Sequence, residues 1–149
     1  MSFIRRAFIV AFALLASACS AKAAGPPEIV VDRTVCSHCG MLVSEPAYAA
    51  AYQADGEAPR LFDDIGCMLD AVRKEIASPL FVWFQDANGG GWLDAKTAIV
   101  ISTPHVSTPM NGGFLAYADT VSAAKAAASH RGEVVGSLPQ LMTWKEGAR

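Results

Sequence analysis

The sequence has no strong excess of charge of either sign. Charged residues make up 17% of its 149 residues, and 12 Lys and Arg stand against 14 Asp and Glu. Proteins that bind nucleic acid or anionic lipid present a basic surface, so this balance excludes both as expected partners. Beyond residue 18 there is also no apolar run near the roughly 20 residues that a membrane-spanning helix needs.

The sequence also lacks the common catalytic motifs. It contains no G-x-S-x-G, no H-E-x-x-H and no glycine-rich phosphate loop. The glycines at 89–91 lie between two predicted strands, which indicates a turn. Asp63 and Asp64 resemble a catalytic carboxylate pair, but capping of the following helix is enough to explain them. We therefore expect that the protein is not an enzyme.

The N-terminus has the pattern of an export signal. Two arginines precede an apolar run at 7–18 that ends in small residues, so 1–18 is predicted to be a signal peptide. Cys19 follows this run as in a bacterial lipobox, although Leu15 lies four positions before it instead of three. We expect lipidation at Cys19, a flexible tether over 19–28, and anchoring to a bacterial membrane, the outer one, on the periplasmic side. The alternative is ordinary cleavage, which would release a soluble protein.

The hydrophobic pattern of 29–149 predicts an α+β domain with short antiparallel strands packed on two helices. One helix begins at Asp63 or Asp64 and ends before Pro79; the other begins at Asp119 or Thr120 and ends at His130. Strands are predicted at 29–31, 41–43, 47–53, 60–62, 80–84, 92–101, 114–117 and 133–135. The two halves, about 29–101 and 102–149, repeat the order methionine, strand, capping Asp and helix, which indicates two small related β/α units.

Soft metal-binding side chains are concentrated in three places. Cys36-Ser-His-Cys-Gly-Met41 contains two thiols, an imidazole and a thioether within six residues. Cys67 and Met68 lie at the start of the first helix, and Met110 lies in the polar loop 103–113. Thiolates and thioethers prefer Cu(I) to hard ions, so these residues predict a Cu(I) site. On a strand, Cys39 and Met41 would face the same side.

Other side chains in these regions have simpler explanations. Met68 lies on the apolar stripe of its helix and is expected in the core. His38 is expected beside the site or in solvent, and His105 is a candidate ligand because it lies near Met110. His130 at a helix C-terminus is explained by the helix dipole.

Three other interpretations of the cysteines stay open at this point. Cys36 and Cys39 could form a redox-active pair, which would make the protein a thiol–disulfide oxidoreductase. With Cys67 and His38 they could form a zinc site that stabilises an interaction module. They could also form a plain disulfide. Since Cys19 belongs to the leader, the other three of the four cysteines form an odd set that pairing alone cannot satisfy.

Four motifs together resemble the NosL-type lipoproteins, accessory proteins of nitrous-oxide reductase. These motifs are Cys36-x-x-Cys-Gly-Met41, Phe62-Asp-Asp-Ile-Gly-Cys-Met68, Trp92-Leu-Asp-Ala95 and Thr108-Pro-Met110. The resemblance implies an α+β fold and a periplasmic copper chaperone for denitrification. It would bind Cu(I) and deliver it to the multi-copper site of nitrous-oxide reductase with a membrane ABC-type assembly complex. It also implies Cys39, Met41 and Met110 as ligands, then Cys36 and Cys67, and then His38 and His105.

Overall fold

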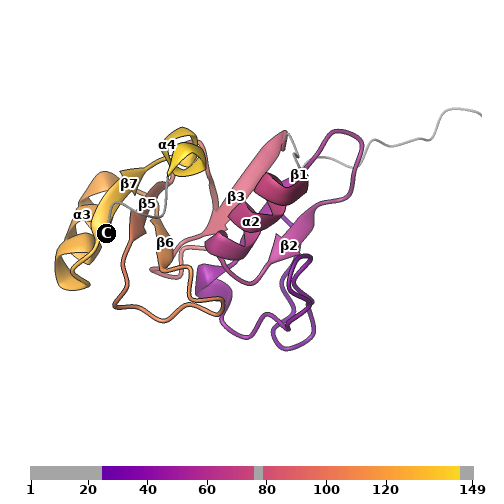
Figure 1. Cartoon of the computed structure of the whole chain (residues 1–149), viewed down its shortest axis with the longest axis horizontal. Helices are drawn as coiled ribbons and strands as arrows, with labels where there is room; N and C mark the ends of the chain where they lie inside the picture. Colours follow the sequence, from indigo (N-terminus) through magenta and orange to yellow (C-terminus); the bar gives the residue numbers. More distant parts are fainter. Residues whose placement is uncertain (1–24, 76–78, 145–149) are drawn as a thin grey trace, which may run out of the picture.

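The computed structural model describes residues 25–75 and 79–144. The predicted signal peptide, Cys19, most of the tether and Ile76 of the predicted helix lie outside the described residues. Within the described part, no helix has the length and apolar character needed to cross a membrane. The predicted α+β class is confirmed, since residues 25–75 and 79–144 contain two small antiparallel sheets and three α-helices (Figure 1).

The first sheet contains four antiparallel strands in the order β2-β1-β3-β4. The strands are β1 (Ala50–Gln53), β2 (Arg60–Phe62), β3 (Phe81–Gln85) and β4 (Trp92–Asp94). A short 3₁₀ helix, η1 (Pro46–Tyr48), precedes β1. The predicted hairpin is confirmed, because β1 pairs with β2 across the turn that contains Asp55 and Gly56.

The second sheet contains β5 (Ile99–Ser102), β6 (Phe114–Tyr117) and β7 (Glu133–Gly136), in the order β6-β5-β7. The continuous strand predicted over 92–101 is wrong. The Asp94 side chain accepts a hydrogen bond from the Lys96 N–H (2.9 Å), and this turn separates β4 from β5. The chain therefore changes sheets between Asp94 and Ile99, a few residues before the predicted division at 101/102.

Two predicted strands near the N-terminus are also wrong. Residues 29–31 form no strand, and 41–43 contribute only one isolated bridge, between Leu42 and Val35. For 41–43, the physical reason is the tight turn between Val35 and Leu42, in which Gly40 has a left-handed backbone (φ 77°). A pattern of apolar residues cannot distinguish a strand from such a short turn-bound segment.

Both predicted helices are present, and each begins after an aspartate. The first, α2 (Ile65–Glu75), follows Asp64, which accepts a hydrogen bond from the Cys67 N–H (2.7 Å). The second, α3 (Thr120–Ser129), is capped by Asp119, as predicted, and His130, where the helix was predicted to end, is its C-cap. The sequence analysis missed α4 (Leu138–Thr143), although Ser137-Leu-Pro-Gln140 carries the capping-box pattern.

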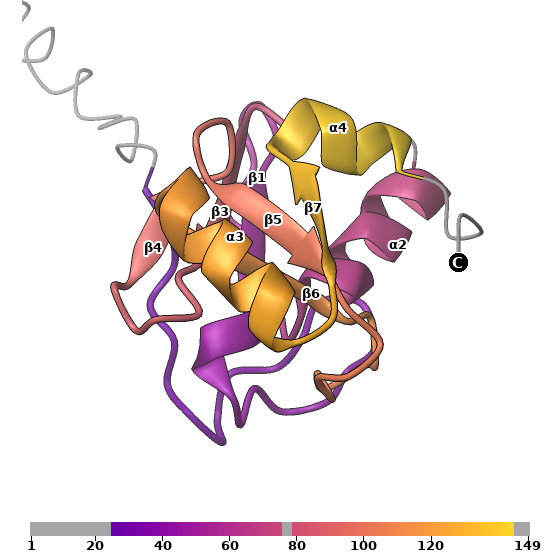
Figure 2. The ribbon, with the colours of Figure 1, turned by 90° about the vertical axis from the view of Figure 1, so that its left-hand side faces the viewer.

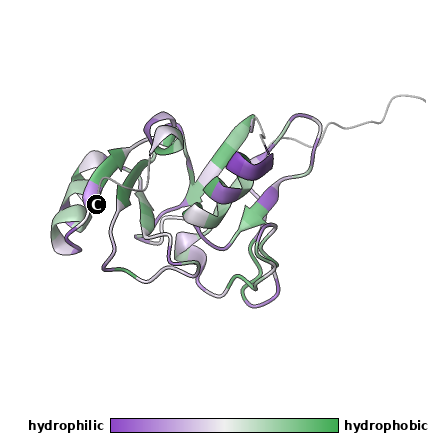
Figure 3. Cartoon of the chain, in the orientation of Figure 1, coloured by the Kyte–Doolittle hydropathy of each residue, from purple (hydrophilic) through white to green (hydrophobic). Residues whose placement is uncertain are grey.

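One hydrophobic core joins the two halves. The apolar stripe of α2 contacts β1, β2 and β6, and Met68 is fully buried there, as predicted. Figure 3 shows that the outward face of α2 is hydrophilic, and Figure 2 shows α3 across the outer face of the second sheet. A parallel bridge between Asp86 and Ala116 adds a backbone link between the sheets. The shared core contains Tyr52, Phe62, Ile65, Met68, Leu69, Phe84, Val100, Phe114 and Leu141.

Because the halves share this core, we predict that they unfold in one cooperative transition. Phe84 is fully buried on β3, between β1 and β4. Phe84→Ala should lower the free energy of unfolding by about 3–5 kcal/mol, since it removes a buried ring and leaves a cavity. Urea denaturation followed by circular dichroism measures this change. The control is Val121→Ala, at a side chain with 76% exposure; two separate transitions would contradict the shared core.

Candidate metal centre

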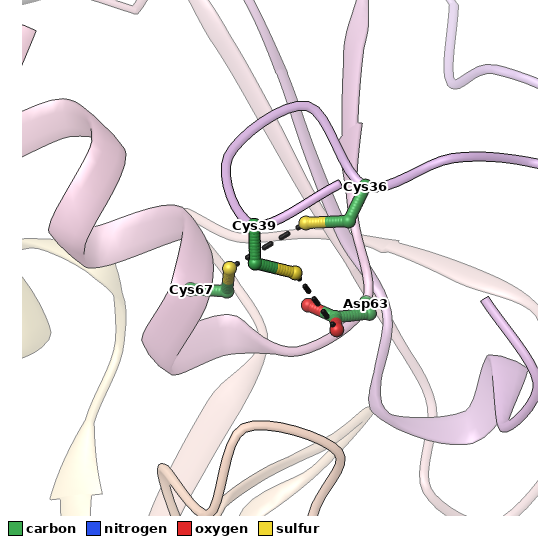
Figure 4. A group of neighbouring side chains, drawn as sticks. All are labelled: Cys36, Cys39, Asp63 and Cys67. Carbon is green, nitrogen blue, oxygen red and sulfur yellow. Dashed lines mark hydrogen bonds between the residues drawn. The ribbon is translucent and has the colours of Figure 1, made fainter. Parts of the chain in front are cut away.

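Three cysteines from two separate segments meet at the N-terminal end of α2. Cys36 and Cys39 lie in one turn, and Cys67 lies in the first turn of the helix (Figure 4). The Sγ atoms of Cys36 and Cys67 are 3.4 Å apart, and both side chains are buried. The three Sγ atoms and a carboxylate oxygen of Asp63 all lie within 4.8 Å of one another. This group of four ligand atoms could hold one metal ion.

The local sequence explains why the two cysteines of the turn face the helix together. The Cys36 N–H donates to the Met41 carbonyl (2.8 Å), and the Gly40 N–H donates to the Cys36 carbonyl (3.1 Å). These bonds close a tight turn that needs the left-handed backbone of Gly40, a conformation that glycine adopts without steric cost. The Ser37 N–H donates to the Leu61 carbonyl (2.8 Å), which attaches the turn to β2.

Asp63 and Asp64 have different roles although they are neighbours. Asp64 caps α2, whereas Asp63 turns its carboxylate towards the thiols. The Cys39 thiol donates to Asp63 Oδ2 (3.4 Å), and the Asp64 N–H donates to Asp63 Oδ1 (3.0 Å). Asp63 is therefore a residue of the site that the sequence analysis assigned only to capping. No local sequence pattern predicts this contact, because Cys39 and Asp63 are 24 residues apart in the chain.

Two thiols of this site, Cys39 and Cys67, hold their protons more tightly than ordinary cysteines. Burial raises the pKa of Cys39 to about 11, helped by hydrogen bonds with Cys36 and Asp63, while a hydrogen bond from the Met41 backbone opposes the shift. Burial also raises the pKa of Cys67 strongly, and its contact with Cys36 adds to the effect. Cys39 and Cys67 are therefore neutral thiols at pH 7. A metal ion that binds their sulfur atoms must displace these protons.

The cysteine cluster opens into a surface pocket of about 440 Å³. Cys39 and Cys67 line it, together with Met110 from the loop between β5 and β6. Met110 is 43% exposed, so it lies at the mouth and not in the core. Two predicted ligand residues of the first half and one of the second half thus share one cavity. Its wall also includes His38, Phe114 and Trp144.

Two other predicted ligand residues, Met41 and His105, do not line the pocket. Met41 is 51% exposed and follows the turn without forming a strand, so the predicted alternation that would align it with Cys39 is wrong. It is not among the residues that line the pocket, and its role as a ligand stays a prediction. His105 is exposed and also lies outside the pocket lining, whereas His38 is part of it.

The raised pKa of Cys39 predicts slow alkylation of the reduced, metal-free protein. At pH 8 a thiol with a pKa of about 11 is ionised about 10²-fold less than an ordinary cysteine. Iodoacetamide should therefore modify Cys39 about 10²-fold more slowly than a model peptide, and the rate should rise as the pH increases towards 11. Peptide mass spectrometry measures the modification of each cysteine. An ordinary rate at pH 8 would contradict the described environment.

Comparisons with known proteins agree with this architecture. The model of the NosL protein family matches residues 27–138. The crystal structure of the copper chaperone NosL from Shewanella denitrificans has a TM-score of 0.65 and 15% sequence identity, and the match covers 74% of this chain and 90% of that one. At this identity the structural likeness concerns the fold. No curated protein sequence matches the chain. Because the family match covers most of its length, the chain belongs to the NosL family.

Proposed function

We propose that this protein is a Cu(I) carrier that receives copper in the cysteine pocket and passes it to a recipient protein. The observation that carries the proposal is the convergence of three free thiols next to a pocket that also contains Met110. Thiolates and thioethers are soft donors, which select Cu(I) over hard cations such as Mg²⁺ and Ca²⁺. Copper is here the cargo of the protein.

The difference in burial among the donors supports transfer by ligand exchange. Cys36 and Cys67 are 1% and 3% exposed, whereas Cys39 and Met110 are accessible from the pocket. A recipient ligand can therefore reach the ion from the open side while the buried sulfur atoms still hold it. Copper would then move between proteins without release into solvent. Cys39 and Met110 are the proposed entry ligands, with Cys36 and Cys67 below them and Met41 beside the turn.

The proposed recipient is the apoprotein of nitrous-oxide reductase, assisted by a membrane ABC-type assembly complex. Membership of the NosL family supports this proposal, as does the description of the Shewanella denitrificans protein as a copper chaperone. The predicted export signal and the lipidation of Cys19 would hold the carrier in the periplasm, at the outer membrane. There it would act as a carrier and not as an enzyme.

The geometry favours the carrier over a thiol–disulfide oxidoreductase. In redox proteins of the Cys-x-x-Cys type, the first cysteine lies at a helix N-terminus, accessible and with a lowered pKa. Here Cys36 lies buried in a turn, and the more accessible Cys39 has a raised pKa. Equilibration with glutathione redox buffers tests this alternative. A reversible Cys36–Cys39 couple in the physiological range would favour the enzyme.

The donor set also has the composition of a zinc site, because three thiols and a carboxylate could surround Zn²⁺. A zinc-stabilised interaction module would need the ion for folding. The core shared by both sheets argues that this domain folds without one. Circular dichroism before and after chelation tests the point, since unfolding of the chelated protein would support the zinc module.

A competition titration with the chelator bicinchoninate tests the carrier function. We expect about one Cu(I) per chain, and Cys39→Ser should weaken binding at least about 10-fold because it removes one of the three proposed thiolate ligands. Met110→Ala should weaken it less, since a thioether is a neutral donor. The matched control is Met68→Leu, a volume-conserving change in the core that should leave Cu(I) affinity unchanged.

Two outcomes would contradict these proposals in different ways. If the wild-type protein does not bind Cu(I), the carrier function is wrong. If it binds Cu(I) while Cys39→Ser and Met110→Ala both retain the wild-type affinity, the ligand assignment is wrong and the function stands.

A further inference from the structure

The carboxylate of Asp64 joins two segments that both line the pocket, the start of α2 and the loop before β6. It is 1% exposed, and its Oδ1 accepts the Cys67 N–H on α2 (2.7 Å). Its Oδ2 accepts the Thr108 hydroxyl (2.8 Å) and the Met110 N–H (3.0 Å), both in the loop before β6. One side chain thus holds a cysteine-bearing helix turn and a methionine-bearing loop that are far apart in the sequence.

The donors around Asp64 suit an ionised carboxylate. Such a group only accepts hydrogen bonds, and it has room for about four. The structure supplies N–H groups from Cys67 and Met110, the Thr108 hydroxyl and a longer contact from the Gly112 N–H (3.5 Å). If the loop moved away, this buried carboxylate would lose all its partners on one side. The position of the loop is therefore coupled to the start of α2.

Two glycines, Gly66 on α2 and Gly112 in the loop, allow the helix and the loop to come close together. A Cβ atom added to Gly66 would lie 3.0 Å from the Cα of Gly112, and one added to Gly112 would lie 3.0 Å from the Cα of Gly66. The backbones of helix and loop are thus in direct contact. The Gly113 N–H donates to the Thr108 hydroxyl oxygen (3.2 Å), and the Asn111 N–H donates to the Thr108 carbonyl (2.8 Å). These hydrogen bonds within the loop close it into a turn.

We propose that Asp64 is a positioning residue for the Cu(I) site, which sets the place of Met110 relative to the thiol cluster. The inference rests on the proposed function. Asp64 contacts the Met110 backbone, and its carboxylate is occupied by hydrogen-bond donors, so it acts through Met110 and not as a ligand. This matters because a thioether is a neutral donor. Its contribution to affinity depends on being held near the ion, and Met110 is otherwise half exposed.

A double-mutant cycle of Asp64→Asn and Met110→Ala tests the proposal through the Cu(I) dissociation constant. Asparagine can keep its carbonyl oxygen towards the Cys67 N–H, but its amide nitrogen cannot accept from the loop. We expect each single variant to weaken Cu(I) binding by a similar factor, up to about 10-fold and less than Cys39→Ser. The double variant should bind no more weakly than Met110→Ala alone, because Asp64 has no further effect once Met110 is absent. Two independent, multiplying effects would overturn the inference.

A second pair of variants keeps the test valid if Asp64→Asn does not fold. Thr108→Val removes the hydroxyl that Asp64 Oδ2 accepts, and Thr108→Ser retains it. We expect Thr108→Val to weaken Cu(I) binding several-fold and Thr108→Ser to restore it. Equal affinities of these two variants would overturn the inference. Asp119→Ala, which removes the remote cap of α3, is the control for a general loss of stability and should leave the dissociation constant unchanged.

A measurement without copper separates this inference from the proposed function. In the metal-free protein, the ¹³C methyl resonance of Met110 should move in Thr108→Val towards the position of a solvent-exposed methionine, and stay in place in Thr108→Ser. An unchanged resonance in Thr108→Val would overturn the inference. Absence of Cu(I) binding by the wild type would instead overturn the proposed function.

Discussion

The packing of α2 against both sheets is the constraint on which the rest of the structure depends. The second sheet also packs on α3, but the core around α2 contains residues of both sheets, and the apolar stripe of this one helix serves both. The N-terminal end of α2 therefore lies where the two halves of the chain meet. Side chains from the turn before β1, from the helix and from the loop before β6 converge at this end.

The adjacent residues Asp63 and Asp64 have different roles where the two halves meet. Asp64 accepts hydrogen bonds from the N–H groups of Cys67 and Met110 and from the Thr108 hydroxyl, so its buried carboxylate has partners on both the helix and the loop. Asp63 faces the thiols and shares in the environment that raises the pKa of Cys39. The Asp64 carboxylate thus holds the backbone segments around the pocket, and the Asp63 carboxylate lies among the candidate metal ligands.

The raised pKa values of Cys39 and Cys67 suit a site that binds a metal ion better than a site in which a thiolate acts as a nucleophile. A neutral buried thiol is a poor nucleophile, yet it becomes a strong ligand when a soft cation replaces its proton. The gradient from buried Cys36 and Cys67 to accessible Cys39 and Met110 then gives the site a closed and an open side. An ion held in this way is protected from solvent but remains reachable by a recipient protein.

Local patterns were enough to predict helices α2 and α3, most strands and the soft character of the site. Local rules were sufficient there, because caps, hydrophobic periodicity and ligand chemistry act over a few residues. No local pattern could predict that the Sγ atoms of Cys67 and Cys36 lie 3.4 Å apart, that Asp63 faces Cys39, or that 92–101 forms two strands of different sheets. Only the packing of the two halves decided that Met110 shares a pocket with the thiols while Met41 does not. These features depend on contacts between segments distant in the sequence, where pairing is chosen by the whole core and not by any local pattern.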